Sequence, residues 1–272
     1  MNLPILGVAG GLKDFQVIKD WIFEKDRALE IQDFVPSATL GAMHEDLISD
    51  YKSFLADHNG LVGIHGPFIN LDIAAIDKEI SAVTTKRLLQ GLDVCEKLGG
   101  THMVVHSPFS AWLSINELNM PSIKRDMFAS SQDVLGPVIK RCEEIGCIMV
   151  LENIDDTDPF IRKELVETFD TDHFKLSIDT GHAQLSHCNN NAPAVVDFII
   201  AAGELLSHVH LQDVDGYADR HWHPLEGIIP WGPVFNELSK IETSPRLILE
   251  PKDRYSLLPT SVERLEEAKL AQ

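Results

Sequence analysis

Short apolar runs alternate with longer amphipathic segments along almost the whole chain, and this repetition is the feature that most constrains the fold. Such an alternation is typical of βα units that build a parallel sheet. We expect strands at residues 5–9, 28–34, 61–67, 101–108, 148–153, 175–180, 206–213 and 246–251. We expect helices at residues 45–56, 78–98, 123–145, 159–169, 194–203, 232–241 and 261–271.

Eight βα units without an intervening linker predict one α/β domain, a (β/α)₈ TIM barrel that spans residues 1–272. In such a barrel the active site lies at the C-terminal ends of the strands. The alternative is an open, doubly wound sheet. That fold would favour a GxGxxG loop after the first strand, and the chain has none there.

The charge balance argues against a nucleic-acid partner. The chain has 23 basic and 42 acidic residues, a formal net charge of −19, and no basic cluster that could hold phosphates.

The first residues lack the features of a signal peptide, and no apolar run reaches the roughly 18 residues of a membrane span. We therefore expect a soluble, cytoplasmic protein that does not bind membranes. A homo-oligomer is compatible with the sequence.

Potential metal ligands stand where the apolar runs end. They are His65, His106, Glu152, Asp179, His182, His210, Asp219, His221 and Glu250. Alternate strand residues face the same way, so Glu152 and Glu250 each lie one layer above an apolar residue, at the solvent end of the barrel. A metal ion is a common partner for carboxylates in such a place. Oxygen and imidazole ligands suit Zn²⁺, Mn²⁺, Co²⁺, Fe²⁺ or Mg²⁺ alike.

Two histidines belong to nearly duplicate segments. Ile64-His65-Gly66-Pro67-Phe68 and Val105-His106-Ser107-Pro108-Phe109 each end a predicted strand in His, a small residue and Pro-Phe. A single histidine there would more often be a hydrogen-bonded structural residue, but two matching copies favour ligands.

An acid and an imidazole follow the sixth predicted strand. We expect Gly181 to permit a tight bend that lets Asp179 and His182 converge. The alternative is an Asp179 that caps a helix beside an incidental histidine. In the next strand His208 and His210 share a parity. His210 is nearer the mouth and is the better ligand, whereas His208 packs or orients a neighbour.

These segments resemble the xylose-isomerase-like barrel superfamily over residues 61–252. That superfamily contains sugar isomerases and epimerases as well as endonuclease-IV-type apurinic-site nucleases. By resemblance to the epimerases, one divalent metal would be held by Glu152, Asp179, His210 and Glu250. Glu152 and Glu250 would also be the catalytic acid–base pair, acting through a metal-stabilised enediolate.

The same resemblance implies a small sugar or sugar phosphate as the substrate and a role in carbohydrate metabolism. His182 would contact substrate oxygens, and His65 and His106 are further candidate substrate-binding residues. The epimerases commonly carry an Arg six residues after the metal-binding His. Gly216 stands there in this chain, and Arg220 is the candidate substitute.

The nuclease branch provides the main alternative. Its three zinc ions use a larger ligand set, for which this chain has additional counterparts in His65, His106, His182, Asp219 and His221. Clustered metals would suit phosphodiester hydrolysis. The net charge and the absence of basic residues from loop 35–41 argue against a duplex-binding surface.

A third hypothesis is a non-catalytic carbohydrate-binding barrel, which would not need both Glu152 and Glu250.

Overall fold

Eight parallel strands close into one barrel in chain order. The computed structural model describes residues 3–272, except for the side chains of residues 42–44. The strands are β1 (Gly7–Gly10), β2 (Leu29–Ile31), β3 (Val62–His65), β4 (His102–His106), β5 (Ile148–Glu152), β6 (Phe174–Asp179), β7 (Leu206–Leu211) and β8 (Arg246–Leu249). Because β8 pairs with β1, the sheet has no open edge. The predicted single-domain TIM barrel is therefore confirmed, and the alternative of an open, doubly wound sheet is wrong.

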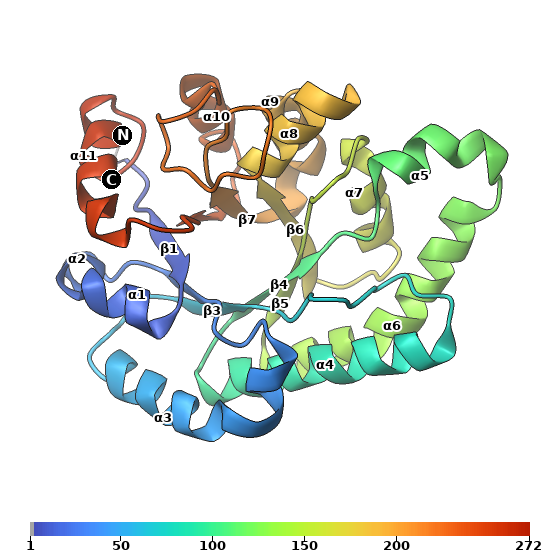
Figure 1. Cartoon of the computed structure of the whole chain (residues 1–272), viewed down its shortest axis with the longest axis horizontal. Coiled ribbons are helices and arrows are strands. Elements are labelled where there is room, and N and C mark those ends of the chain that lie inside the picture. The colour runs from blue at the N-terminus through green and yellow to red at the C-terminus, as the bar shows by residue number, and fades with distance from the viewer. Residues whose placement is uncertain (1–2) are drawn as a thin grey trace.

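Helices surround the strands, and both ends of the chain lie beside α11 (Figure 1). The helices are α1 (Leu12–Val17), α2 (Lys19–Glu24), α3 (His44–Leu55), α4 (Lys78–Lys97), α5 (Ala111–Asn116), α6 (Ile123–Ile145), α7 (Pro159–Glu167), α8 (Thr180–Asn190), α9 (Val195–Ala202), α10 (Trp231–Leu238) and α11 (Leu258–Glu267). Within the described residues, no helix combines the length and the apolar character that crossing a membrane requires. The sequence did not predict α1, α2, α5 or α8.

Local signals explain where the long helices begin and end. The side chain of Asp77 accepts hydrogen bonds from the backbone at the start of α4, and that of Asp158 does so for α7, whose first residue is Pro159. Helix α6 ends at Gly146, whose φ of 69° is left-handed and therefore favours glycine.

The barrel has an apolar outer layer and a polar interior. Strand residues such as Ile64 and Leu151 belong to one core cluster with helix residues such as Leu92 and Leu135. By contrast, Glu30 on β2 contacts His208 on β7, although β1 and β8 separate these two strands. The contact therefore crosses the interior, where most TIM barrels pack branched apolar residues.

Candidate metal centre

Four side chains from the last strands of the barrel meet at its C-terminal end. Glu152 ends β5, Asp179 ends β6, His210 lies in β7, and Glu250 directly follows β8. One ligand atom from each of the four lies within 4.8 Å of the others. Glu152 and Glu250 are 1% and 7% exposed, and Asp179 and His210 are fully buried, so all four are shielded from bulk solvent, although both glutamates line the cavity described below.

Each of the three carboxylates has one oxygen that the protein satisfies. Oε1 of Glu152 lies 3.0 Å from Nδ1 of His210. Oδ1 of Asp179 accepts a hydrogen bond of 2.7 Å from the backbone N–H of His182. Oε1 of Glu250 accepts one of 2.7 Å from Nε2 of Gln32. The three side chains are therefore held in fixed orientations.

The second oxygen of each carboxylate is buried without a hydrogen-bond partner among the described residues. These atoms are Oε2 of Glu152, Oδ2 of Asp179 and Oε2 of Glu250. Buried acceptors are costly when nothing pairs with them, and several negative charges together are costlier still. Three oxygens beside an imidazole nitrogen are a ligand set that suits a divalent cation. The residues therefore fit the metal ion that the sequence led us to expect.

The carboxylates also determine the charge of the imidazole. Burial alone would lower the pKa of His210, but the negative charges of Glu250, Glu30 and Glu152 raise it well above its ordinary value. Burial raises the pKa of Asp179, and the charges of Glu250 and Glu152 raise it further, against the effect of His182. Both shifts have the same cause, which is that the neighbouring carboxylates favour positive charge at this centre.

Two further groups of potential ligands flank this cluster. On one side, Nε2 of His65 and Nε2 of His106 lie 3.6 and 3.7 Å from Oε2 of Glu152, and 3.2 Å from each other. On the other, Oδ2 of Asp219 lies 3.5 Å from Nε2 of His182 and 3.0 Å from Nε2 of His221. The structure therefore brings all the ligands predicted from the sequence to one end of the barrel.

A cavity of about 570 Å³ opens above these groups. Asp179 and His210 lie below it, whereas the other predicted ligands line it, together with the apolar side chains of Val35, Pro36 and Phe68. A volume of this size suits a small organic molecule.

Comparisons with known proteins agree with this geometry. A family model described as xylose isomerase-like TIM barrel matches residues 27–270. The chain belongs to the xylose isomerase-like TIM barrel family. The resemblance found in the sequence is thereby confirmed.

Relatives of known sequence or structure extend the comparison. Uncharacterized protein MJ1311 of Methanocaldococcus jannaschii is 23% identical over 196 residues, which cover 70% of this chain and 64% of that protein. A D-tagatose 3-epimerase-like protein superposes with a TM-score of 0.77 at 21% identity, over 97% of this chain and 96% of the other. D-psicose 3-epimerase of Clostridium cellulolyticum H10 gives a TM-score of 0.69 at 18% identity, over 92% and 86% of the two chains. The structural neighbours thus include sugar epimerases.

In this member of the family, the segment after β6 is a helix rather than the tight bend we expected. Asp179 caps α8 by accepting the hydrogen bond from His182 N–H, so the helix-cap alternative describes the backbone correctly. A Cβ atom on Gly181 would lie 2.3 Å from Cδ of Gln212, so glycine is needed for close packing and not for a bend. Capping with one oxygen leaves the other oxygen of Asp179 available to a cation.

Arg220 does not reach the cavity. Its Nε and Nη2 lie 2.9 and 2.8 Å from Oδ2 of Asp215, and its guanidinium stands over the ring of Trp222. Arg220 is absent from the cavity wall, whereas Lys252 is part of it. The structure thus gives no support to Arg220 as a substitute for the missing arginine, and it adds a basic side chain that sequence reasoning missed.

Two more residues at this centre were missed. Gln32 holds Glu250, and Glu30 lies 3.0 Å from His210. A carboxylate between Leu29 and Ile31, inside a predicted strand, was the available signal, because a charged residue in a buried strand needs a partner.

Proposed function

We propose that the protein is a divalent-metal-dependent isomerase or epimerase that acts on a small sugar or sugar phosphate. The observation that carries this proposal is a set of three buried carboxylate oxygens that have no hydrogen-bond partner in the described part of the chain. They converge with Nδ1 of His210 beneath a cavity of about 570 Å³. The names of the structural neighbours, a D-tagatose 3-epimerase-like protein and a D-psicose 3-epimerase, support the same reaction class.

A cation held by Glu152, Asp179, His210 and Glu250 would polarise the carbonyl and hydroxyl oxygens of the substrate and acidify the adjacent C–H bond. In our proposal one of Glu152 and Glu250 removes that proton and the other returns it to the substrate. Glu152 ends β5 and Glu250 follows β8; these strands are not neighbours in the barrel, and both residues line the cavity. They can thus approach a bound substrate from different sides.

The remaining lining residues would bind and orient the substrate. Nδ1 of His182 lies 3.0 Å from the backbone oxygen of Asn153, which fixes the ring at the cavity wall. His65 and His106 line the opposite side, and the ring of His106 stacks on Phe68 at 4.0 Å. Imidazoles so fixed can form hydrogen bonds with sugar hydroxyls, while Phe68 offers an apolar face to C–H groups.

Proton exchange with solvent tests the proposal. Protein reconstituted with Mn²⁺, Co²⁺ or Zn²⁺ is incubated with a panel of ketoses, aldoses and their phosphates in D₂O, and C3 epimerisation, aldose–ketose conversion and deuterium incorporation are followed by NMR. We expect Glu152→Gln and Glu250→Gln to lose at least about 100-fold in rate, as expected for loss of a proton-transfer group. Glu263→Gln on the exposed face of α11 is the matched control. Inactivity across the panel, with Glu152→Gln binding sugars as the wild type does, would falsify the proposal.

A second candidate is phosphodiester hydrolysis at a multinuclear site. The His65–His106–Glu152 and His182–Asp219–His221 groups favour it, because each could hold a further ion beside the first. The net charge of −19 argues against duplex DNA as the substrate. Elemental analysis of bound metal and cleavage of an abasic duplex distinguish the candidates: one ion without cleavage supports the isomerase, whereas two or three ions with cleavage support the nuclease.

The third candidate, a non-catalytic carbohydrate-binding barrel, makes a different prediction in the same assay. It requires sugar binding that is retained in Glu152→Gln, with no turnover or deuterium incorporation under any of the metals. The pair of carboxylates in one cavity argues against it, because binding alone does not need a proton acceptor on each side of the substrate.

A further inference from the structure

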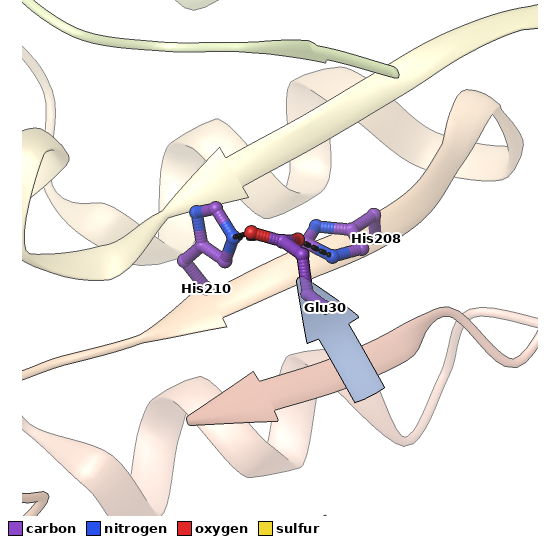
Figure 2. A group of neighbouring side chains, drawn as sticks. All are labelled: Glu30, His208 and His210. Atoms are coloured by element: carbon purple, nitrogen blue, oxygen red, sulfur yellow. Dashed lines mark hydrogen bonds and ion pairs between the residues drawn. The ribbon is translucent and has the colours of Figure 1, made fainter. Parts of the chain in front are cut away.

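The two ring nitrogens of His210 face different carboxylates. Nδ1 lies 3.0 Å from Oε1 of Glu152 and 3.4 Å from Oε2 of Glu250, so it is the nitrogen that faces the proposed metal centre. Nε2 lies 3.0 Å from both side-chain oxygens of Glu30, on the opposite side of the ring. Figure 2 shows Glu30 between the rings of His210 and His208.

The contacts of Glu30 define which nitrogen of each histidine carries a proton. An ionised carboxylate only accepts hydrogen bonds, so Nε2 of His210 is the donor to Glu30. Nε2 of His208 also donates to Glu30, at 2.9 Å from Oε2. Nδ1 of His208 then accepts from the hydroxyl of Ser177, at 2.9 Å. Each polar atom in this series of contacts is thus either a hydrogen-bond donor or a hydrogen-bond acceptor.

With Nε2–H given to Glu30, Nδ1 of His210 either carries a second proton that it donates to Glu152, at 3.0 Å, or offers a lone pair to a cation. A metal ion between Nδ1 and the carboxylate oxygens would take the place of that second proton. The same nitrogen lies 4.0 Å from Oδ2 of Asp179 and 3.4 Å from Oε2 of Glu250. Glu30 therefore selects the tautomer of His210 that a metal ion at this centre requires.

The burial of Glu30 inside the barrel indicates that its carboxylate has a specific role. The residue is 2% exposed and lies in β2, and it reaches β7 across the barrel interior. A carboxylate in that environment carries a desolvation cost that an apolar residue of similar size would avoid. Its hydrogen bonds go to the two histidines and end on a predicted metal ligand.

We propose that Glu30 is a positioning residue of the metal centre, which holds the Nε2–H tautomer of His210 and so presents Nδ1 to the cation. The inference rests on the metal centre of the proposed function. A carboxylate that accepts from the far nitrogen of a ligating histidine fixes the orientation of the ring and increases its basicity as a ligand. Loss of such a partner typically weakens metal binding by about 10–100-fold. His208, through its bond to the same carboxylate, in turn holds Glu30 in place.

Metal titration of Glu30→Gln tests this role. The substitution keeps the shape of the side chain but removes its charge and places an N–H₂ group against an N–H donor. Zn²⁺ and Mn²⁺ are each titrated against a competing chelator, and we expect the variant to bind about 10–100-fold more weakly than the wild type. The matched control is His173→Gln, at a half-buried residue just before β6 whose Nδ1 lies 2.7 Å from the backbone oxygen of Cys147. Its affinity should equal that of the wild type.

A measurement on the wild type makes the test independent of whether the variant folds. In ¹⁵N-histidine-labelled protein loaded with ¹¹³Cd²⁺, we expect His210 to bind the metal through Nδ1 and to keep its proton on Nε2. Coordination through Nε2, or equal affinities for the wild type and Glu30→Gln, would overturn the positioning role and leave the proposed function intact. Failure of the wild type to bind any of these metals would instead overturn the metal centre and the proposed function with it.

Discussion

Nε2 of Gln32 donates a hydrogen bond of 2.7 Å to Oε1 of Glu250, and this bond fixes the carboxylate on the cavity wall. Gln32 directly follows β2, and Glu250 directly follows β8. The other oxygen of Glu250, Oε2, lies 3.4 Å from Nδ1 of His210 and has no hydrogen-bond partner within residues 3–272. Gln32 therefore directs the oxygen of Glu250 that is available for a metal or a proton.

Replacing Gln32 with leucine should weaken the centre without unfolding the protein. Oε1 of Glu250 would lose its donor, and an unsatisfied buried acceptor costs about 1–3 kcal/mol. We expect metal affinity or kcat/KM on an identified sugar to fall by about 10-fold or more. Gln90→Leu on α4, far from the cavity, is the matched control. Equal metal affinity and turnover in Gln32→Leu and wild type would show that Glu250 needs no anchor.

Metal ions should stabilise the fold, because the centre gathers Glu30, Glu152, Asp179 and Glu250 in a buried volume. A ligand at 100 times its Kd adds about 2.7 kcal/mol to the free energy of unfolding. For a chain of this size that shift corresponds to a rise in Tm of roughly 5 °C. Differential scanning calorimetry with a chelator and with added Zn²⁺ or Mn²⁺ measures it.

The variant Asp179→Asn separates this stabilisation from nonspecific metal effects. It removes one negative charge and one ligand oxygen, so the apo protein should lose little stability while the response to metal should largely disappear. A Tm that rises equally with metal in the wild type and in Asp179→Asn would mean that the ion binds elsewhere.

The strands could be read from the sequence because each is a short apolar run, and burial on both faces forces that pattern on a parallel barrel. Helix α8 could not be read in the same way. Its first turn, Thr180-Gly181-His182, looks like a bend, and only the packing of Gln212 against Gly181 explains the glycine. Tertiary contact overrode local propensity there.

The ligands were also readable, because each stands at the end of a predicted strand and strand ends meet on one rim. Glu30 was not, because its partners His208 and His210 are far away in the sequence and on a strand that is not a neighbour of β2. Only closure of the barrel brings them together. The prediction that Arg220 binds substrate finds no support for a different reason. Its guanidinium pairs with Asp215, a residue close to it in the sequence, and so lies outside the cavity.

Stability should depend on pH through His102. Burial, together with the positive charge of Arg246, lowers the pKa of His102 to about 2 in the folded protein. An unfolded histidine has a pKa of about 6.5, so between these values the unfolded chain binds more protons. The free energy of unfolding should therefore fall as the pH falls below about 6.5, by at most about 1.4 kcal/mol per pH unit from this residue.

Urea denaturation at pH 7.5, 6.0 and 5.0 measures this contribution as a difference between wild type and His102→Gln. The variant should lose stability less steeply over that range, because it lacks the group that protonates on unfolding. His187→Gln, a change at an exposed residue of α8, should follow the wild-type curve. Parallel curves for His102→Gln and wild type would refute the assignment.

Asp213 should control the order of the loop that supplies Asp219 and His221. Its buried carboxylate accepts hydrogen bonds from the backbone of Val214, Leu225 and Ile229 and from the indole of Trp231. In Asp213→Asn an N–H₂ group would face these donors, which should cost about 2 kcal/mol or more. Amide hydrogen exchange should accelerate across residues 214–230. Asp253→Asn, at an exposed residue beside Arg254, should change stability by less than about 0.5 kcal/mol.

Adding a single methyl group at Gly181 should disturb the centre from outside the ligand set. A Cβ atom there would lie 2.3–2.5 Å from the side-chain amide of Gln212. That amide donates to Asp179 at 3.1 Å and to Asp219 at 2.8 Å, and it accepts from the backbone N–H of His221 at 3.1 Å. Moving it would release all three contacts at once.

We therefore expect Gly181→Ala to destabilise the protein by about 1–3 kcal/mol, as overpacking does, and to weaken metal binding as well. Gly136→Ala is the matched control, because Gly136 lies within α6 with nothing within 4 Å of its added Cβ. That change should stabilise the helix by about 0.5–1 kcal/mol. Urea denaturation and chelator competition measure both variants. If Gly181→Ala binds metal as tightly as Gly136→Ala, Gln212 does not link the helix α8 to the centre.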